Sequence, residues 1–313
     1  MKLSNRTQCS AVLGLTLLAF ALRAYRLGAQ SFWIDEALTL HYASLPADQL
    51  WHVLQTTEIT PPLYYYVIMG WKWLVGTSEY AIRFCSLVLG VMSVPLTYRL
   101  GKSLGDVRLG IVAALLMAVA PYQIWHSQDA RQYAMFTAAS IVSMWSFVAM
   151  WQCRGRRWIL LYILGTEWAL MTHYHALALI GVQGLFLLVT GRRQYKDFLK
   201  WVMALAVVLA VFAVRLFFGF GMLKGFHSWV PQPSLWETFT RSAVAYSVGE
   251  LVPYPQAALL TVAFLALYAL GLYYAARRRW GVWNGTEMLV LMLAYTLAPN
   301  LAAWVVGELR SPV

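Results

Sequence analysis

Charged residues are scarce in this sequence. Asp, Glu, Lys and Arg together make up 12% of the 313 residues, whereas hydrophobic residues make up 60%. A soluble domain carries about 25% charged residues, so this chain has too few to cover a water-facing surface. Lipid must therefore be the solvent for much of the chain, which excludes an ordinary soluble protein. The 15 Trp and 18 Tyr residues agree with this, because their amphipathic rings favour the boundary between membrane and water.

Acidic residues and cysteines are also few. With only 13 acidic residues the formal net charge is +11, which could suggest a nucleic-acid partner. We expect no such partner, because the basic residues stand in short clusters between apolar runs, where membrane topology explains them. The three cysteines, Cys9, Cys85 and Cys153, lie far apart and show neither the spacing of a metal site nor a disulfide framework.

Long apolar runs are plentiful. The first run, from Ala11 to Leu22, is followed by Arg23 and Arg26 without a good cleavage site, which favours a retained anchor over a signal peptide. A spanning helix needs about 20 apolar residues, and on this criterion the sequence predicts an all-α polytopic transmembrane bundle of about nine spans. They are expected at residues 9–27, 80–99, 109–126, 132–152, 157–172, 175–190, 201–220, 256–275 and 286–306.

Basic residues gather on alternate connections between these spans. The positive-inside rule makes those connections cytoplasmic, which predicts a multi-pass protein of the cell (inner or plasma) membrane with a cytoplasmic N-terminus. Residues 28–79 and 221–255 are then the two large extracytoplasmic loops. The orientation requires that the stretch from Pro61 to Gly76 does not cross the membrane. It is short, contains Lys72 and is rich in aromatics, so we expect an amphipathic helix in the outer interface.

Three acids in the first outer loop are candidates for chemistry. Asp35 and Glu36 are adjacent and directly follow the first span. Such a pair can accept a proton from an attacking hydroxyl, bind a divalent cation such as Mg²⁺ or Mn²⁺, or be ordinary solvated charge. Glu58 precedes Pro61-Pro62, and a helix begun by this diproline could bring Glu58 to the same pocket. The alternative is an acid that merely flanks a helix.

Two arginines are candidate phosphate ligands. In the segment HSQDARQY, Asp129 and Arg131 lie at the outer end of the third predicted span. A cation beside an acid can hold a phosphate there, or can form a simple interfacial ion pair. Arg83, at the start of the second span, is the other candidate, because a guanidinium fork can bind two phosphate oxygens.

The segment THYH holds His173 and His175, also predicted to face outward. Residues two apart do not share one helix face, which disfavours a helical zinc pair. A hydrogen bond to a substrate and a structural role both remain open for them.

Four segments in order resemble the GT-C glycosyltransferases. The similarity is closest to the bacterial branch that resembles protein O-mannosyltransferases and lipid A aminoarabinose transferases, and it covers about residues 20–190. Beyond that the match is mainly one of topology. The segments are W-x-D-E-A at Trp33 to Ala37, the run from Pro61 to Ser86, APYQIWHSQDARQYAM from Ala120 to Met135, and THY at Thr172 to Tyr174.

The resemblance implies a GT-C-like bundle with interfacial helices in the first outer loop, and a donor sugar linked to a polyprenyl phosphate or diphosphate. Asp35 matches the acidic catalytic position of the family and Glu36 its neighbour, while Asp129 and Arg131 lie where the family has a charged motif facing the active cavity. Tyr64 and Tyr133 fall within the similar segments and join the candidate substrate-binding residues. Relatives usually continue beyond the ninth span, so we expect a fragment or a short member.

The predicted function is therefore that of a membrane glycosyltransferase formed by residues 1–313 as a single transmembrane domain. It would move a sugar from a polyprenyl-phosphate donor to a hydroxyl of a glycan, lipid or protein acceptor, with inversion and with Asp35 as general base. A transporter of a lipid-linked sugar or small solute is the alternative, and a non-catalytic subunit of envelope assembly is another. Transporters commonly contain inverted repeats, and we find none here.

Overall fold

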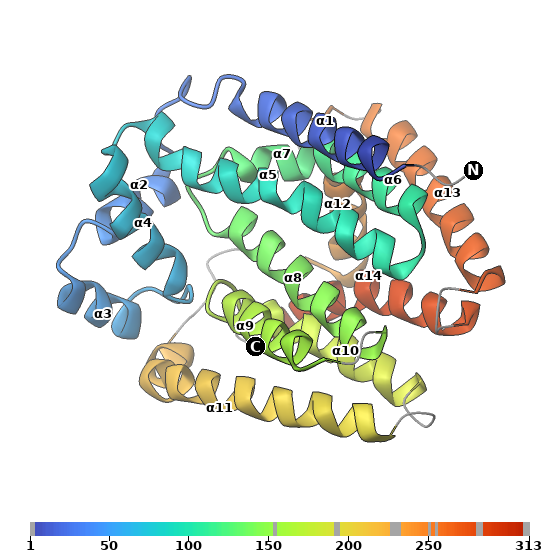
Figure 1. Cartoon of the computed structure of the whole chain (residues 1–313). Coiled ribbons are helices and arrows are strands. Elements are labelled where there is room, and N and C mark those ends of the chain that lie inside the picture. Colours follow the sequence, from blue (N-terminus) through green and yellow to red (C-terminus); the bar gives the residue numbers. More distant parts are fainter. Residues whose placement is uncertain are drawn as a thin grey trace. The chain divides into compact units, whose positions relative to one another are not determined.

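The computed structural model of the chain describes residues 4–152, 155–190, 195–225, 233–249, 252–253, 256–279 and 284–308. All regular structure within these residues is helical, which confirms the all-α prediction (Figure 1). The helices are α1 (Asn5–Ala24), α2 (Ile34–Tyr42), α3 (Ala47–Thr56), α4 (Leu63–Val75), α5 (Glu79–Leu104), α6 (Val107–Val119), α7 (Pro121–Ser127), α8 (Tyr133–Gln152), α9 (Arg156–Leu170), α10 (Ala176–Thr190), α11 (Tyr195–Gly225), α12 (Leu235–Val248), α13 (Gln256–Arg277) and α14 (Gly285–Glu308).

The chain is a multi-pass membrane protein, but the nine predicted spans are not shown. In the described residues, four helices are long and apolar enough to cross a membrane, namely α1, α5, α8 and α13. A fifth span is added if α6 and α7, which meet at a bend of 59°, are counted as one broken helix. α9 and α10 are also helical where predicted, but each has 15 residues. That length corresponds to about 22 Å, less than the roughly 30 Å of a bilayer core.

The chain divides into two compact units. Unit 1 comprises residues 1–119, 123–174 and 202–225, and unit 2 comprises residues 120–122, 175–201 and 226–313. In unit 1, α8 packs between α5 and α9, and α1 lies along α5 and α6 (Figure 1). In unit 2, α14 packs against α10, α12 and α13.

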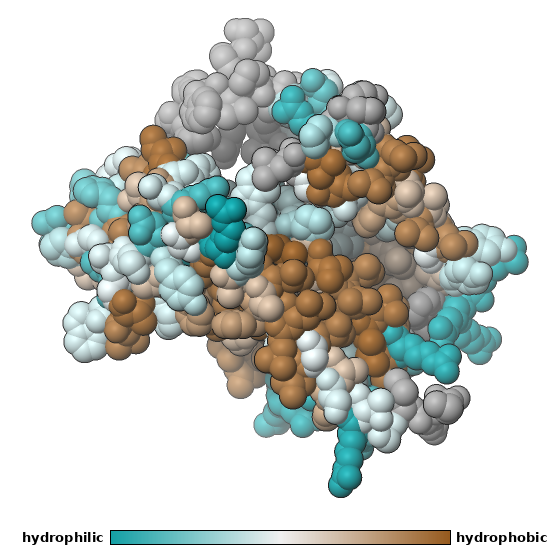
Figure 2. Space-filling view, turned by 90° about the horizontal axis from the view of Figure 1, so that it is seen from above, coloured by the Kyte–Doolittle hydropathy of each residue, from teal (hydrophilic) through white to brown (hydrophobic). Residues whose placement is uncertain are grey.

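Burial separates the central helix of unit 1 from a peripheral one. In α8, 67% of the most apolar window is buried, whereas in α1 the share is 11%. Leu13 and Leu17 of α1 and Leu116 of α6 are each about 60% exposed. Apolar side chains form a wide brown area on the face shown in Figure 2. Apolar exposure on this scale is expected where lipid is the solvent.

The first predicted outer loop folds into three short helices, α2, α3 and α4. α4 buries Tyr64, Tyr65 and Ile68 and packs against α2 and α5. Its first residue, Leu63, donates its backbone N–H to the carbonyl of Met171 at 3.0 Å, which joins the start of α4 to the end of α9. With 13 residues, α4 is too short to span a bilayer. The second predicted outer loop, residues 221–255, is described only in part and contains α12 there.

Candidate active site

Glu36 is completely buried and both of its carboxylate oxygens are occupied. Oε1 accepts hydrogen bonds from Arg83 Nε at 2.8 Å and from the backbone N–H of Ala130 at 2.7 Å. Oε2 accepts from Arg83 Nη2 at 2.6 Å and from the backbone N–H of Trp33 at 3.3 Å. The last bond caps the first turn of α2. Glu36 therefore joins α2 to α5 and to the segment before α8, and it has no oxygen left for an acceptor proton or a cation.

Every hydrogen-bond donor of the Arg83 guanidinium is also in use. Besides Glu36, it donates to the backbone carbonyls of Leu27 and Gln30 from Nη1, at 3.1 and 2.8 Å, and of Ser31 from Nη2, at 3.1 Å. All five N–H groups of the guanidinium thus have protein acceptors, and the residue is 6% exposed. This arrangement leaves Arg83 no donor for a phosphate. It fixes the turn between α1 and α2 instead.

Asp35 and Arg131 form a much looser pair. The closest ion-pair distance, Arg131 Nη2 to Asp35 Oδ2, is 3.9 Å, and 38% of the Asp35 side chain is exposed against 11% for Arg131. Arg131 Nη1 donates to Thr39 Oγ1 at 3.1 Å and to the backbone carbonyl of Asp35 at 3.3 Å. The buried Nε of Arg131 has no hydrogen-bond partner in the described part of the chain. The pair therefore combines an accessible carboxylate with a guanidinium that has spare donor capacity.

Acidic groups gather around Arg131. Burial alone would lower the pKa of Arg131, but Tyr65, Tyr133, Asp35 and Glu58 act in the opposite direction and the net effect raises it. Burial, and then the charge of Glu58, raise the pKa of Tyr65. The charges of both Glu58 and Asp35 thus act on the guanidinium of Arg131. Glu58 is held by the backbone N–H of Thr60, which donates to its Oε1 at 2.8 Å.

Two consecutive hydrogen bonds hold the backbone carbonyl of Arg131. The Ser86 hydroxyl donates to the carbonyl of Arg131 at 3.2 Å and lies 2.7 Å from the hydroxyl of Tyr64. Because the proton of Ser86 is used on this carbonyl, the Tyr64 hydroxyl is the donor to Ser86. Tyr64 is 1% exposed. Its polar end is thus used inside the protein, not on a surface where a substrate would contact it.

Three further candidates, Asp129, Tyr133 and His173, lie near His126 or its ring neighbours in unit 1. Asp129 Oδ2 lies 3.5 Å from His126 Nδ1. The His126 ring packs on Tyr133 with 4.5 Å between centroids, and Tyr133 lies 6.2 Å from the His173 ring. Nine of the ten predicted site residues belong to unit 1, and His175 belongs to unit 2. Within the described residues, no group of three or more His, Cys, Asp or Glu side chains is placed to hold a metal ion.

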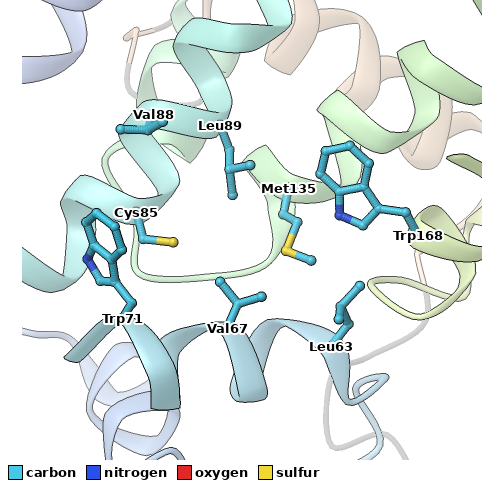
Figure 3. A pocket seen from close by; sticks show the side chains of 8 residues that line it. All are labelled: Leu63, Val67, Trp71, Cys85, Val88, Leu89, Met135 and Trp168. Carbon is cyan, nitrogen blue, oxygen red and sulfur yellow. The ribbon is translucent and has the colours of Figure 1, made fainter. Parts of the chain in front are cut away.

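An apolar pocket of about 360 Å³ lies in unit 1 (Figure 3). Its side chains are all apolar or aromatic, and four helices contribute them. They include Leu63 and Val67 of α4, Cys85 and Leu89 of α5, Met135 of α8 and Trp168 of α9. Cys85 and Met135 pack in the same core cluster as Tyr64 and Ala130. The pocket therefore has room for part of a hydrocarbon chain.

Three residues that form hydrogen bonds with the site residues were not predicted from the sequence. Thr39 accepts from Arg131, Ser86 holds its carbonyl, and the backbone N–H of Ala130 binds Glu36. For Thr39 a signal existed, because it follows Asp35 by four residues and therefore lies on the same face of a helix. For Ser86 and Ala130 there was none, because their roles depend on how α5 packs against the segment before α8.

The sequence matches the profile of one protein family. The sequence profile of the dolichyl-phosphate-mannose-protein mannosyltransferases matches residues 60–218, just over half of the chain. No curated protein sequence matches the chain.

Solved structures are similar in fold. The protein O-mannosyltransferase complex of S. cerevisiae bound to its sugar donor has a TM-score of 0.55 at 18% identity, over 81% of this chain and 38% of that one. ArnT from Cupriavidus metallidurans in the apo state has a TM-score of 0.60 at 14% identity, over 95% and 62% of the two chains. The same enzyme bound to undecaprenyl phosphate has a TM-score of 0.55 at 12% identity, over 93% and 59%.

The chain therefore spans between 38% and 62% of the length of these solved structures, which share its fold. The profile match supplies what such distant structural likeness does not. It runs from Thr60, just before α4, through α5, the segment that carries Arg131, and α8. On that match, this chain belongs to the dolichyl-phosphate-mannose-protein mannosyltransferase family, whose members are GT-C membrane glycosyltransferases.

Proposed function

We propose that this chain transfers a sugar from a polyprenyl-phosphate carrier to an acceptor hydroxyl at the extracytoplasmic face of the cell membrane. The observation that carries the proposal is the pairing of Asp35 with Arg131 in the unit that also contains the apolar pocket. Asp35 offers an accessible carboxylate, and Arg131 offers a buried donor without a partner in the described residues. The pocket offers room for hydrocarbon. These are the three features that a lipid-phosphate donor and a hydroxyl acceptor require.

In the proposed topology the N-terminus is cytoplasmic and residues 28–79 are extracytoplasmic. The clusters of Lys and Arg on alternate connections support this orientation. α4 supports it as well, because a helix too short to span can lie in the interface and leave the later connections on their predicted sides. Residues 1–313 then form one transmembrane glycosyltransferase-like domain.

Each part of the site has one task in the reaction. The first isoprene units of the donor lie in the apolar pocket, and its phosphate binds the guanidinium of Arg131. Asp35 takes the proton of the acceptor hydroxyl as the oxygen attacks the anomeric carbon. The bond from that carbon to the phosphate oxygen breaks, and its electron pair leaves with the phosphate. A single displacement of this kind inverts the anomeric centre.

The leaving group explains why one carboxylate suffices. A phosphate ester leaves as an anion, so it needs cationic stabilisation more than it needs a proton. Ordinary glycoside hydrolysis, in contrast, uses two carboxyl groups. Arg131 supplies the cation and Asp35 the base, while Arg83 and Glu36 position both of them. This reassigns Arg83 from phosphate ligand and Glu36 from catalytic acid to positioning residues, in line with their saturated hydrogen bonds.

The similar structures support the type of donor. One is a protein O-mannosyltransferase complex bound to its sugar donor, and another is ArnT bound to undecaprenyl phosphate. A donor of the same chemical type would suit the apolar pocket and Arg131 of this chain. A glycan, a lipid and a protein all remain candidate acceptors.

The test is a transfer assay in membranes that contain the full chain. Membranes with and without the chain are incubated with a panel of radiolabelled polyprenyl-phosphate sugars. We expect one donor to release free polyprenyl phosphate and to label a glycan, lipid or protein fraction only when the chain is present. Movement of an intact lipid-linked sugar across the bilayer without release of polyprenyl phosphate would instead identify a transporter and overturn the proposal.

A further inference from the structure

Arg23 is an arginine without any exposed surface at the end of α1. Its Nη1 and Nη2 donate to the carbonyls of Ala118 and Met117, both at 2.9 Å, and Nη1 also reaches the carbonyl of Ala19 at 3.3 Å. Ala118 and Met117 lie in the last turn of α6, where carbonyls have no intrahelical partner and carry partial negative charge. Nε donates to Ser127 Oγ at 3.1 Å. Arg23 thus bonds both helices that flank the bend between α6 and α7.

Hydrogen bonds between the end of α1 and the end of α7 run in both directions. Gln128 donates its side-chain amide back to the carbonyls of Arg23 and Tyr25, at 3.0 and 2.9 Å. Ser127 and Gln128 are therefore fixed to the end of α1 by side-chain bonds in both directions. They are the first two residues of a five-residue segment, 127–131, which we call the connector.

The other end of the connector reaches the proposed active site. The backbone N–H of Ala130 binds the buried carboxylate of Glu36, and the guanidinium of Arg131 binds Thr39 and the carbonyl of Asp35. Five consecutive residues thus join Arg23 at one end to the acidic turn of α2 at the other. Because hydrogen bonds hold both ends of the connector, we expect a shift of Ser127 to reach Arg131.

Gly90 of α5 shows how tightly this junction is packed. A Cβ placed on Gly90 would lie 2.7 Å from Ser127 Cβ and 3.3 Å from Arg23 Nε. Real Cβ atoms are essentially never as close to another atom as 2.7 Å. Any side chain at position 90 must therefore push α5 and the connector apart. α1, α5 and the connector meet at one point where only glycine fits.

The stability of the fold does not by itself explain why position 23 holds an arginine. A buried charged side chain in a membrane protein is costly, and well-packed apolar residues often stabilise as well as buried ionic groups do. An apolar residue could fill the space of Arg23, but it could not bind the end of α6 and Ser127 at once. What the charge adds is a fixed geometry for the connector.

We propose that Arg23 is a positioning residue for the transfer reaction. Its guanidinium holds the connector, at the end of α7, to the last turn of α6 and thereby aims Arg131 at the donor phosphate beside Asp35. This inference rests on the function proposed above. It assigns no contact between Arg23 and the substrate, because Arg23 acts only through Ser127 and the connector.

Kinetics of three substitutions test the role. Arg23→Lys keeps the charge but loses the fork, Ser127→Ala removes one oxygen, and Gly90→Ala wedges the junction. A misplacement of about 1 Å can reduce turnover by roughly 10²-fold, so we expect kcat to fall about 10-fold to 100-fold in each variant. Thr166→Val is the matched control, because it removes a buried hydrogen bond to Ser143 between α8 and α9 without touching the connector. We expect it to lower stability and leave kcat unchanged.

Amide hydrogen exchange of the purified full chain gives a readout that does not depend on activity. The Ala130 amide binds a buried carboxylate and should exchange slowly. We expect faster exchange over residues 128–131 in Arg23→Lys and Ser127→Ala, and no change in Thr166→Val. Ser127→Ala keeps the test valid if Arg23→Lys does not fold, because it alters only the connector side of the bond.

The possible failures are distinguishable. If the wild-type chain transfers no sugar from any donor, the proposed function fails and the role of Arg23 in it fails too. If the wild type transfers sugar and the variants keep its kcat, only the role of Arg23 is overturned, whatever the exchange rates show. Unchanged exchange over residues 128–131 in both variants would equally overturn it, because the connector would then not depend on Arg23.

Discussion

Two arginine–carboxylate pairs, one closed and one open, lie side by side at the start of α2. In the closed pair, Arg83 and Glu36 are 2.6 Å apart, and the Glu36 side chain has no exposed surface. In the open pair, Arg131 and Asp35 are 3.9 Å apart, and the Asp35 side chain is 38% exposed. Successive helical residues point about 100° apart, so two adjacent acids can have opposite environments. Adjacency in sequence is therefore no guide to shared chemistry.

The contrast divides structural from catalytic tasks. The closed pair has no unused donor or acceptor, so a ligand could bind it only by breaking internal bonds. The open pair has an accessible carboxylate and an unpartnered Nε within the described residues. Substitutions in the closed pair should therefore act on folding, and those in the open pair on transfer.

The largest effect is expected from Glu36→Gln in the closed pair. Removing one partner of a buried ion pair leaves an uncompensated charge and costs about 3–5 kcal/mol, which is a large part of the stability of most proteins. The measurement is denaturant or thermal unfolding of the purified chain. Asp48→Asn, an exposed acid in the first turn of α3, is the control and should change little. Equal stability of Glu36→Gln and wild type would show that the pair is not closed.

The second effect separates the pairs most clearly. Asp35→Asn should lower kcat by about 10²–10⁴-fold, the usual contribution of a general base. It should change the free energy of unfolding by less than about 0.5 kcal/mol, as is common for accessible positions. Asp48→Asn serves again as the control. If Asp35→Asn turned over donor at the wild-type rate, Asp35 would have no part in the mechanism.

Asp35 and Glu36 also show which features could be predicted from the sequence and which could not. The apolar runs predicted an all-α membrane protein, and the motifs predicted the family. Both predictions are confirmed. The different environments of Asp35 and Glu36 could not be predicted, because they depend on where Arg83 and Ala130 lie around α2.

The number of spans, of which four or five are shown in the described residues, illustrates a related point. An apolar run shows where a helix forms but not where it bends or stops. The predicted span at 109–126 is broken by a bend of 59°, and α9 and α10, the helices at the predicted spans 157–172 and 175–190, have 15 residues each. Arg23 binds the carbonyls left unpaired at that bend. In the sequence Arg23 indicated only that the first span is a retained anchor.

A third prediction concerns the cation of the open pair. Arg131→Lys keeps the charge but loses the planar fork and the free Nε. A hydrogen bond to a charged group contributes about 1.5–3 kcal/mol, so we expect kcat/KM for the polyprenyl-phosphate sugar to fall about 10-fold to 100-fold. Arg99→Lys, at an exposed position toward the other end of α5, is the matched control. An unchanged kcat/KM in Arg131→Lys would mean that the phosphate binds elsewhere.

The smallest effect should come from Tyr64→Phe. The sequence placed Tyr64 among the substrate-binding residues, whereas in the structure its hydroxyl binds Ser86, which in turn holds the carbonyl of Arg131. Loss of one such hydrogen bond costs about 1 kcal/mol, so stability should fall slightly while the donor KM stays within about 3-fold of wild type. Tyr98→Phe is the matched control, because the Tyr98 hydroxyl likewise donates to a side chain, Gln8, at 3.0 Å. The two variants should show similar unfolding and similar KM values. A 10-fold rise in the donor KM for Tyr64→Phe alone would show that this hydroxyl contacts the donor. The donor site would then include α4 as well as the open pair.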